Sequence, residues 1–120
     1  MGYLIAAVED LFFASKIRAA AEPLGIEVAF AKSAEIALAA ARSKKPRLII
    51  VDLQARSFNP IELARTLKAD YGLYEIELVG FFSHVQASLQ RDAQAAGYNR
   101  VLPRSVFTKQ LAEILQTARD

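Results

Sequence analysis

The chain has 120 residues, a net charge of +2 and no cysteine. Its length suits a single domain. Hydrophobic residues make up 53% of the chain and charged residues 23%, a composition that indicates a folded core and not disorder. The lack of cysteine excludes disulfide scaffolds, thiolate zinc sites and cysteine nucleophiles, and a single histidine excludes a multi-histidine metal centre. Fifteen basic against 13 acidic residues form no dense basic face, so no nucleic-acid partner is expected.

The N-terminal segment does not read as a targeting signal. An apolar run over residues 3–8 ends at Glu9 and Asp10, without the basic start and longer apolar run of a signal peptide. No uninterrupted apolar stretch approaches the roughly 20 residues of a membrane span. We therefore expect a cytoplasmic protein without membrane contact.

In chain order, short apolar runs alternate with stretches of helical period. The predicted strands are residues 3–8, 27–31, 48–51, 76–82 and 101–102. The stretches between them repeat apolar residues at helical spacing, as in Phe13, Ile17, Ala20 and Leu24, in Val85, Leu89, Ala93 and Ala96, and in Phe107, Leu111, Ile114, Leu115 and Ala118. Ser33 and Asn59-Pro60 are suited to the N-termini of the second and third helices.

This alternation predicts an α/β protein, with one domain over residues 1–120 and no internal repeat or linker. Strands that alternate with helices form a parallel sheet with helices on both faces. We expect a doubly wound, flavodoxin-like sheet of five strands in the order 2-1-3-4-5, with five helices. Functional residues in such sheets lie at the carboxyl ends of the strands.

Three carboxyl groups are predicted at that edge. Glu9 and Asp10 follow the first strand, Asp52 follows the third, and these strands are neighbours in the order 2-1-3-4-5. Carboxylates about 4 Å apart repel by roughly 4 kcal/mol per pair at an effective dielectric constant of 20. A Mg²⁺ ion would offset this repulsion, or one carboxyl would stay protonated. The alternative is that Asp10 only caps the first helix.

Two further side chains are predicted at the same edge. Ser83 ends the fourth strand and Arg104 follows the fifth. A hydroxyl and a fixed positive charge at this edge are suited to bind an anionic group attached to the Asp52 carboxylate. The alternatives are a helix cap for Ser83 and an ordinary surface arginine for Arg104.

These motifs resemble the receiver domain of two-component response regulators over nearly the whole chain. The resemblance rests on Glu9-Asp10, on Leu48-Ile49-Ile50-Val51-Asp52-Leu53, on Ser83 and on Ala95-Ala96-Gly97. It implies that Asp52 accepts a phosphoryl group from a phosphohistidine on a histidine kinase or phosphotransfer protein. It also implies that Ser83 senses the phosphoryl group and that output reaches a downstream effector protein.

The resemblance also implies a metal site and little enzymatic activity. Asp10, Asp52 and the backbone carbonyl of Gln54 would bind Mg²⁺, with Glu9 close by. The expected chemistry is limited to self-phosphorylation from a phosphodonor and autodephosphorylation. The resemblance does not predict the oligomeric state.

Several positions depart from the receiver pattern. Arg104 stands where receivers usually carry a lysine, and a planar guanidinium does not replace a compact ammonium conservatively. Val101 takes the place of an aromatic switch residue, and His84 follows Ser83 where a small residue is common. His84 is either a partly exposed helix residue or a gate to the phosphoryl site. We therefore expect an atypical receiver that is phosphorylated on Asp52, or alternatively a pseudo-receiver that binds proteins without phosphorylation.

Two other classes fit less well. A flavin or nucleotide binder needs a loop rich in glycine or hydroxyl groups after the first strand, whereas residues 9–13 are acidic and then bulky. A Mg²⁺-dependent hydrolase would need a substrate pocket or lid, for which the short loops leave little room. Phe12 and Phe13 are consecutive, so a helix cannot bury both on one narrow stripe.

Overall fold

The computed structural model describes residues 2–119 and confirms the predicted α/β class. A parallel sheet has the order β2-β1-β3-β4-β5. Its strands are β1 (Gly2–Ala7), β2 (Ile26–Ala31), β3 (Leu48–Asp52), β4 (Glu77–Phe82) and β5 (Arg100–Pro103). The helices are α1 (Leu11–Ala21), the short 3₁₀ helix η1 (Glu22–Leu24), α2 (Ala34–Ser43), α3 (Pro60–Ala69), α4 (Ala87–Ala96), α5 (Arg104–Lys109) and α6 (Leu111–Gln116).

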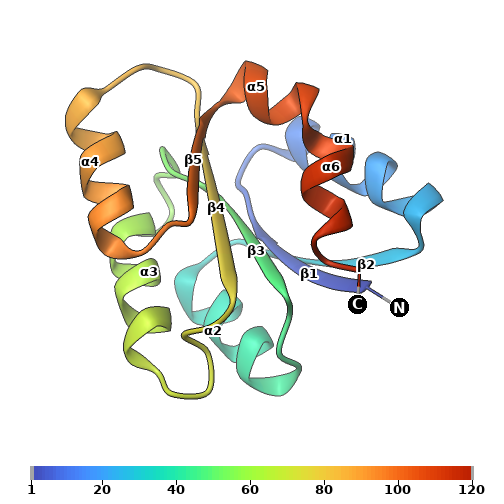
Figure 1. Ribbon diagram of the computed structural model, residues 1–120, viewed down its shortest axis with the longest axis horizontal. Coiled ribbons are helices and arrows are strands. Elements are labelled where there is room, and N and C mark those ends of the chain that lie inside the picture. Colours follow the sequence, from blue (N-terminus) through green and yellow to red (C-terminus); the bar gives the residue numbers. More distant parts are fainter. Residues whose placement is uncertain (1, 120) are drawn as a thin grey trace.

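Helices cover both faces of the sheet, as the alternating pattern predicts. Figure 1 shows α2, α3 and α4 on one side and α1, α5 and α6 on the other. Successive residues of β3 point to opposite faces: Ile49 belongs to the core under α2–α4, and Ile50 to the core under α1, α5 and α6. Because both faces are buried, the central strands are continuous apolar runs rather than alternating ones.

The C-terminal helical stretch differs from the prediction of one helix. It is divided into α5 and α6 at Gln110, where φ is −98° and ψ is 10°. Phe107, Leu111 and Ile114 are buried on both sides of this break. The hydrophobic period therefore continues across it, which is why the sequence pattern predicted five helices where the chain has six α-helices within residues 2–119.

The predicted start of α4 is also corrected. The apolar period places Val85 on its buried stripe, but the helix begins at Ala87 and Val85 is 79% exposed. The segment from Ser83 to Gln86 is instead a loop that joins β4 to α4. This loop lies at the carboxyl end of β4, the edge at which the sequence predicts the site.

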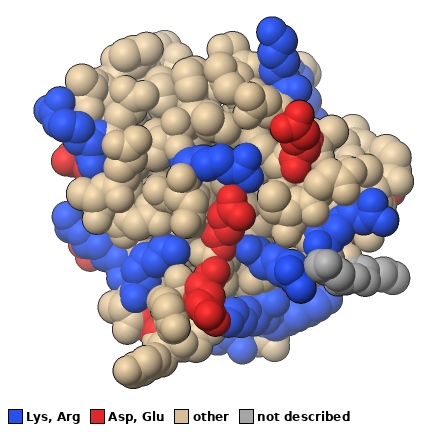
Figure 2. Space-filling model, viewed as in Figure 1, with Lys and Arg blue, Asp and Glu red and all other residues tan. Residues whose placement is uncertain are grey.

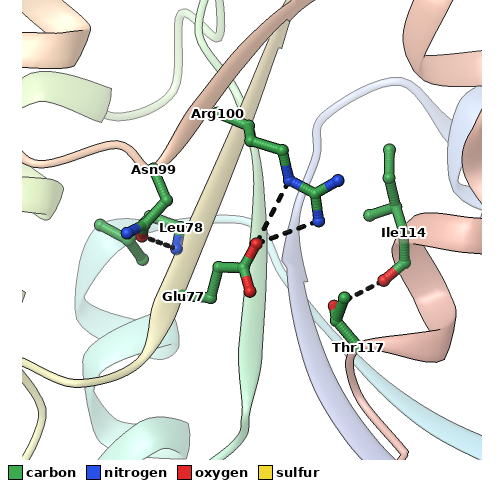
Figure 3. A network of polar contacts seen from close by, with 6 residues as sticks. All are labelled: Glu77, Leu78, Asn99, Arg100, Ile114 and Thr117. Carbon is green, nitrogen blue, oxygen red and sulfur yellow. Dashed lines mark hydrogen bonds and ion pairs between the residues drawn. The ribbon is translucent and has the colours of Figure 1, made fainter.

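The opposite end of the sheet is held by polar contacts between β4 and the start of β5. The Leu78 amide donates to Asn99 Oδ1 at 2.8 Å, and Arg100 Nη2 lies 3.0 Å from Glu77 Oε2 (Figure 3). The two chain ends also meet, since the Tyr3 amide donates to the Ala118 carbonyl at 3.3 Å. The Asn99 and Arg100 contacts fix the edge strand β5 at the end remote from the site, and the Ala118 contact joins the C-terminal segment to β1.

Charges of both signs are mixed over the surface. On the face shown in Figure 2, acidic and basic side chains are interspersed among a larger area of other residues. Several are in ion pairs, such as Lys44 with Glu27 at 2.9 Å. Over the described range 2–119, no helix has the length and apolar character required to cross a bilayer.

Candidate functional site

A cavity of about 530 Å³ opens at the carboxyl end of the sheet. Five of the six predicted site residues line it: Asp10 after β1, Asp52 at the end of β3, Gln54 in the loop after β3, Ser83 after β4 and Arg104 after β5. Parallel neighbouring strands end at the same edge, so the strand order alone brings these distant residues together.

Asp52 is the half-buried carboxylate of this cavity. Its Oδ1 accepts a hydrogen bond from the Gln54 amide at 3.0 Å. Burial raises the pKa of Asp52 above its ordinary value, and the nearby Glu9 and Asp10 charges act in the same direction. The Gln54 hydrogen bond and the Arg104 charge partly oppose this shift in the pKa. The surroundings therefore disfavour the negative charge on Asp52.

Asp10 combines the two roles that the sequence left as alternatives. As the N-cap of α1, its Oδ1 accepts from the amides of Phe12 at 2.9 Å and Phe13 at 3.3 Å. Its Oδ2 faces Arg104, whose Nη2 lies 3.4 Å away. The capping bonds hold the Asp10 carboxylate in place, and its Oδ2 remains directed at the Arg104 guanidinium.

Arg104 is held between a charge and an aromatic ring. Its guanidinium carbon lies 4.5 Å from the ring centroid of Phe13. Phe13 is 1% exposed and packs against Phe81, with ring centroids 4.6 Å apart, whereas Phe12 is 69% exposed. As expected for consecutive residues on one helix, only one of the two rings is buried on the stripe, and the buried Phe13 ring packs against the Arg104 guanidinium.

Glu9 lies near Asp52, whose pKa its charge helps to raise, but it does not line the cavity with Asp10 and Asp52. Its two oxygens accept from the backbone amides of Arg56 and Ser57, each at 2.7 Å. These hydrogen bonds lower the pKa of Glu9. Within residues 2–119, no three acidic or histidine side chains are arranged to hold a metal ion. The loop after β3 turns the Arg56 and Ser57 amides toward the end of β1, and these donors orient the Glu9 carboxylate toward that loop.

Gln54 has a role that the sequence analysis missed. The prediction concerned only its backbone carbonyl, whereas the structure shows its side chain bound to the β4–α4 loop. Oε1 accepts from the amides of Ser83 at 2.7 Å and His84 at 3.1 Å, and Nε2 donates to the His84 carbonyl at 2.9 Å. No local pattern signals such contacts, because all the partners are backbone groups about 30 residues away.

Ser83, His84 and Val101 lie around the carboxyl ends of β4 and β5. Ser83 does not cap α4, because the N-cap of that helix is Gln86. His84 lies in the β4–α4 loop and not in a helix, so the first alternative for it is wrong; it is exposed and lines the cavity, and its gating role stays a prediction. Val101 is partly buried against the core beneath α2–α4. A short aliphatic side chain thus fills the position at which the resemblance implies a rotating ring.

Comparisons with known proteins identify the fold through structure rather than sequence. No protein-family model matches the chain, and no curated protein is similar to it in sequence. The solved structure of the chemotaxis response regulator CheY4 of Vibrio cholerae aligns with a TM-score of 0.84 and 17% identity, over 98% of each chain. The phosphorylated cyanobacterial phytochrome response regulator RcpA aligns with a TM-score of 0.82 and 18% identity, over 96% of this chain and 89% of that one.

A third neighbour carries a metal in its solved structure. The Mn²⁺-bound form of response regulator Rcp1 aligns with a TM-score of 0.83 and 13% identity, over 95% of this chain and 91% of that one. The chain therefore has the fold of a response-regulator receiver domain, as the sequence resemblance predicted. At these identities the likeness establishes the fold.

Proposed function

We propose that this protein is an atypical receiver in a two-component phosphorelay, with Asp52 as the phosphoacceptor. The observation that carries the proposal is the half-buried Asp52 carboxylate in a cavity shared with Asp10, Ser83 and Arg104. The receiver fold of the neighbouring structures makes a phosphohistidine on a histidine kinase or phosphotransfer protein the expected donor. A downstream effector protein would bind the altered surface. The expected setting is the cytoplasm, with no direct role for nucleic acid or membrane.

The transfer itself needs few protein groups. An Asp52 oxygen attacks the phosphorus, the P–O bond forms as the P–N bond to the donor imidazole breaks, and the imidazole takes up a proton. Arg104, fixed by Asp10 and the Phe13 ring, supplies positive charge beside the incoming phosphoryl oxygens. The Ser83 hydroxyl, on the loop across the cavity, would donate to one of those oxygens.

The cavity chemistry fits Mg²⁺ as the expected cofactor. Mg²⁺ prefers oxygen ligands and usually binds one or two carboxylates while it retains several waters. Asp10 and Asp52 supply two carboxylates facing one cavity, and the backbone carbonyl of Gln54 is the proposed third protein ligand. When bound, the ion would neutralise charge on the phosphoryl oxygens. Glu9, held by two backbone amides, would act only at longer range.

Acetyl phosphate with Mg²⁺ provides the direct test. We expect a covalent mass increase of one phosphoryl group on the wild-type protein and none on Asp52→Asn. The exposed Asp92 on α4 offers a matched control, and Asp92→Asn should be modified like the wild type. Lack of an adduct at millimolar acetyl phosphate, together with unchanged amide NMR shifts around Asp52 on addition of beryllofluoride and Mg²⁺, would contradict the proposal.

A second function, that of a phosphorylation-independent pseudo-receiver, is favoured by one specific contact. Arg104 already lies 3.4 Å from Asp10, so a resident cation offsets part of the negative charge of the cavity. If the Arg104 charge already neutralises the carboxylates of the cavity, the domain would keep one conformation and bind its partner without phosphorylation. In that case partner binding would be the same for wild type and Asp52→Asn, with or without acetyl phosphate.

A further inference from the structure

The side chain of Gln54 links the two loops that face the Asp52 carboxylate. Its backbone amide donates to Asp52 Oδ1 at 3.0 Å, and its side-chain amide bonds to the β4–α4 loop three times. One residue thus contacts both the proposed phosphoacceptor and the segment that carries Ser83. The Leu53 amide bond to Phe81, at 2.9 Å, belongs to the sheet and is a separate contact.

The three side-chain bonds hold a loop that has few other restraints. Ser83, His84, Val85 and Gln86 are all exposed, and α4 begins only at Ala87 without a side-chain cap bond. Exposed loops with few buried contacts open at low free energy. The position of this loop therefore depends strongly on the Gln54 amide.

The same bonds occupy donors that an anion in the cavity would attract. Gln54 Oε1 is a neutral acceptor for the amides of Ser83 and His84, and both residues line the cavity with Asp52. Hydrogen bonds to charged acceptors are about twice as strong as those between neutral groups. An anionic group on Asp52 would compete with Gln54 for this loop.

We infer that the Gln54 side chain is a latch that holds the β4–α4 loop in its resting position and opposes binding of a phosphoryl-like group at Asp52. The inference rests on the proposed function and assigns a conformational relay to it. Such a relay needs no rotating ring at Val101, because the restraint acts directly between the loops after β3 and β4. Gln54 is a positioning residue in this scheme and does not itself react.

Gln54→Met tests the latch because methionine matches glutamine in length but cannot donate or accept these bonds. Gln86→Met is the matched control, since Gln86 lines the same cavity and makes no side-chain cap bond to α4. We expect amide solvent exchange at Ser83 and His84, followed by NMR, to be about fivefold faster in Gln54→Met, the factor typical of one lost hydrogen bond. Exchange at Leu53 should not change.

Beryllofluoride binding separates a latch from a merely structural contact. A latch lowers the population of the binding-competent loop, so its loss should tighten beryllofluoride binding with Mg²⁺ by about fivefold. A structural contact would leave this affinity unchanged or weaken it, and either result overturns the inference. Gln54→Ala repeats both measurements if the methionine variant does not fold, with the thermal melt of each variant recorded.

The two arms also separate this inference from the proposed function. If neither protein binds beryllofluoride but loop exchange still responds to Gln54→Met, the phosphorylation proposal fails and the loop restraint is supported. If exchange at Ser83 and His84 matches the wild type in both Gln54 variants, the latch is refuted whether or not beryllofluoride binds.

Discussion

Replacing Glu9 by glutamine tests whether this carboxylate serves the backbone or a metal ion. The two Glu9 oxygens accept from the amides of Arg56 and Ser57 at 2.7 Å each. Glutamine keeps one acceptor oxygen and turns an NH₂ group toward the other amide. One charge-assisted hydrogen bond is therefore lost, and the other becomes neutral.

The magnitude follows from the exposure of the site. A hydrogen bond to a charged group contributes about 1.5–3 kcal/mol, and solvent screening at a half-exposed position reduces this to about 1 kcal/mol. For a domain of this size the corresponding fall in Tm is roughly 3–6 °C. Glu113, exposed in the first turn of α6, provides the control, and Glu113→Gln should change Tm by much less.

The assay is thermal or urea unfolding of wild type and Glu9→Gln at several pH values in EDTA. Because the hydrogen bonds lower the pKa of Glu9 in the folded state, their stabilisation is fully present above the unfolded-state pKa of about 4.3. It is lost as the pH falls through the lower folded-state pKa. We therefore expect a constant difference in unfolding free energy from pH 7 to about 5, shrinking below about pH 4.

The decisive comparison is between EDTA and Mg²⁺. If Glu9 serves only the backbone, the same loss of stability is expected in both, because its partners are the Arg56 and Ser57 amides. A difference between wild type and Glu9→Gln that appeared only with Mg²⁺ would refute this reasoning and assign Glu9 to the metal. Equal stability of the two proteins in EDTA at pH 7 would refute it as well.

Three further changes have defined outcomes. Burial raises the pKa of Asp52, so its ionised form costs stability above its folded-state pKa; Asp52→Asn should raise Tm at pH 7 and lose this advantage as the pH falls through 4. Tyr98→Phe removes a buried hydroxyl that donates to the Pro60 carbonyl at 2.8 Å, and urea unfolding should show a loss of about 1–2 kcal/mol. Gly80→Ala would place a Cβ 2.7 Å from buried Leu53 carbons, and the repacking should cost about 1–3 kcal/mol in the same assay; unchanged unfolding would contradict either assignment.

The fold was predictable because its local signals agree with one another. Buried strands such as β3 are continuous apolar runs, and Ser33 and Asn59 form the helix caps that their positions predict. The break at Gln110 was not predictable, because the apolar period runs through it. Periodicity reports which side of a segment is buried and does not report whether its axis bends.

The candidate site was predictable at the level of residues that follow strands. Asp10, Asp52, Ser83 and Arg104 share a cavity because each lies at the carboxyl end of a strand of one parallel sheet. The orientation of each side chain was not predictable in this way. Glu9 turns to the loop after β3, although its position in the sequence is equivalent to that of Asp10.

Local sequence patterns were sufficient to predict the class of the fold and the strand ends at which polar residues gather, and the composition excludes thiol chemistry. The pairing of the charges and amides becomes visible only in the folded chain. It turns Glu9 to two backbone amides, sets Arg104 against Asp10 and lays the Gln54 amide across to the β4–α4 loop. Hydropathy and capping act over a few residues along the chain, whereas these pairs join groups 29 to 94 positions apart.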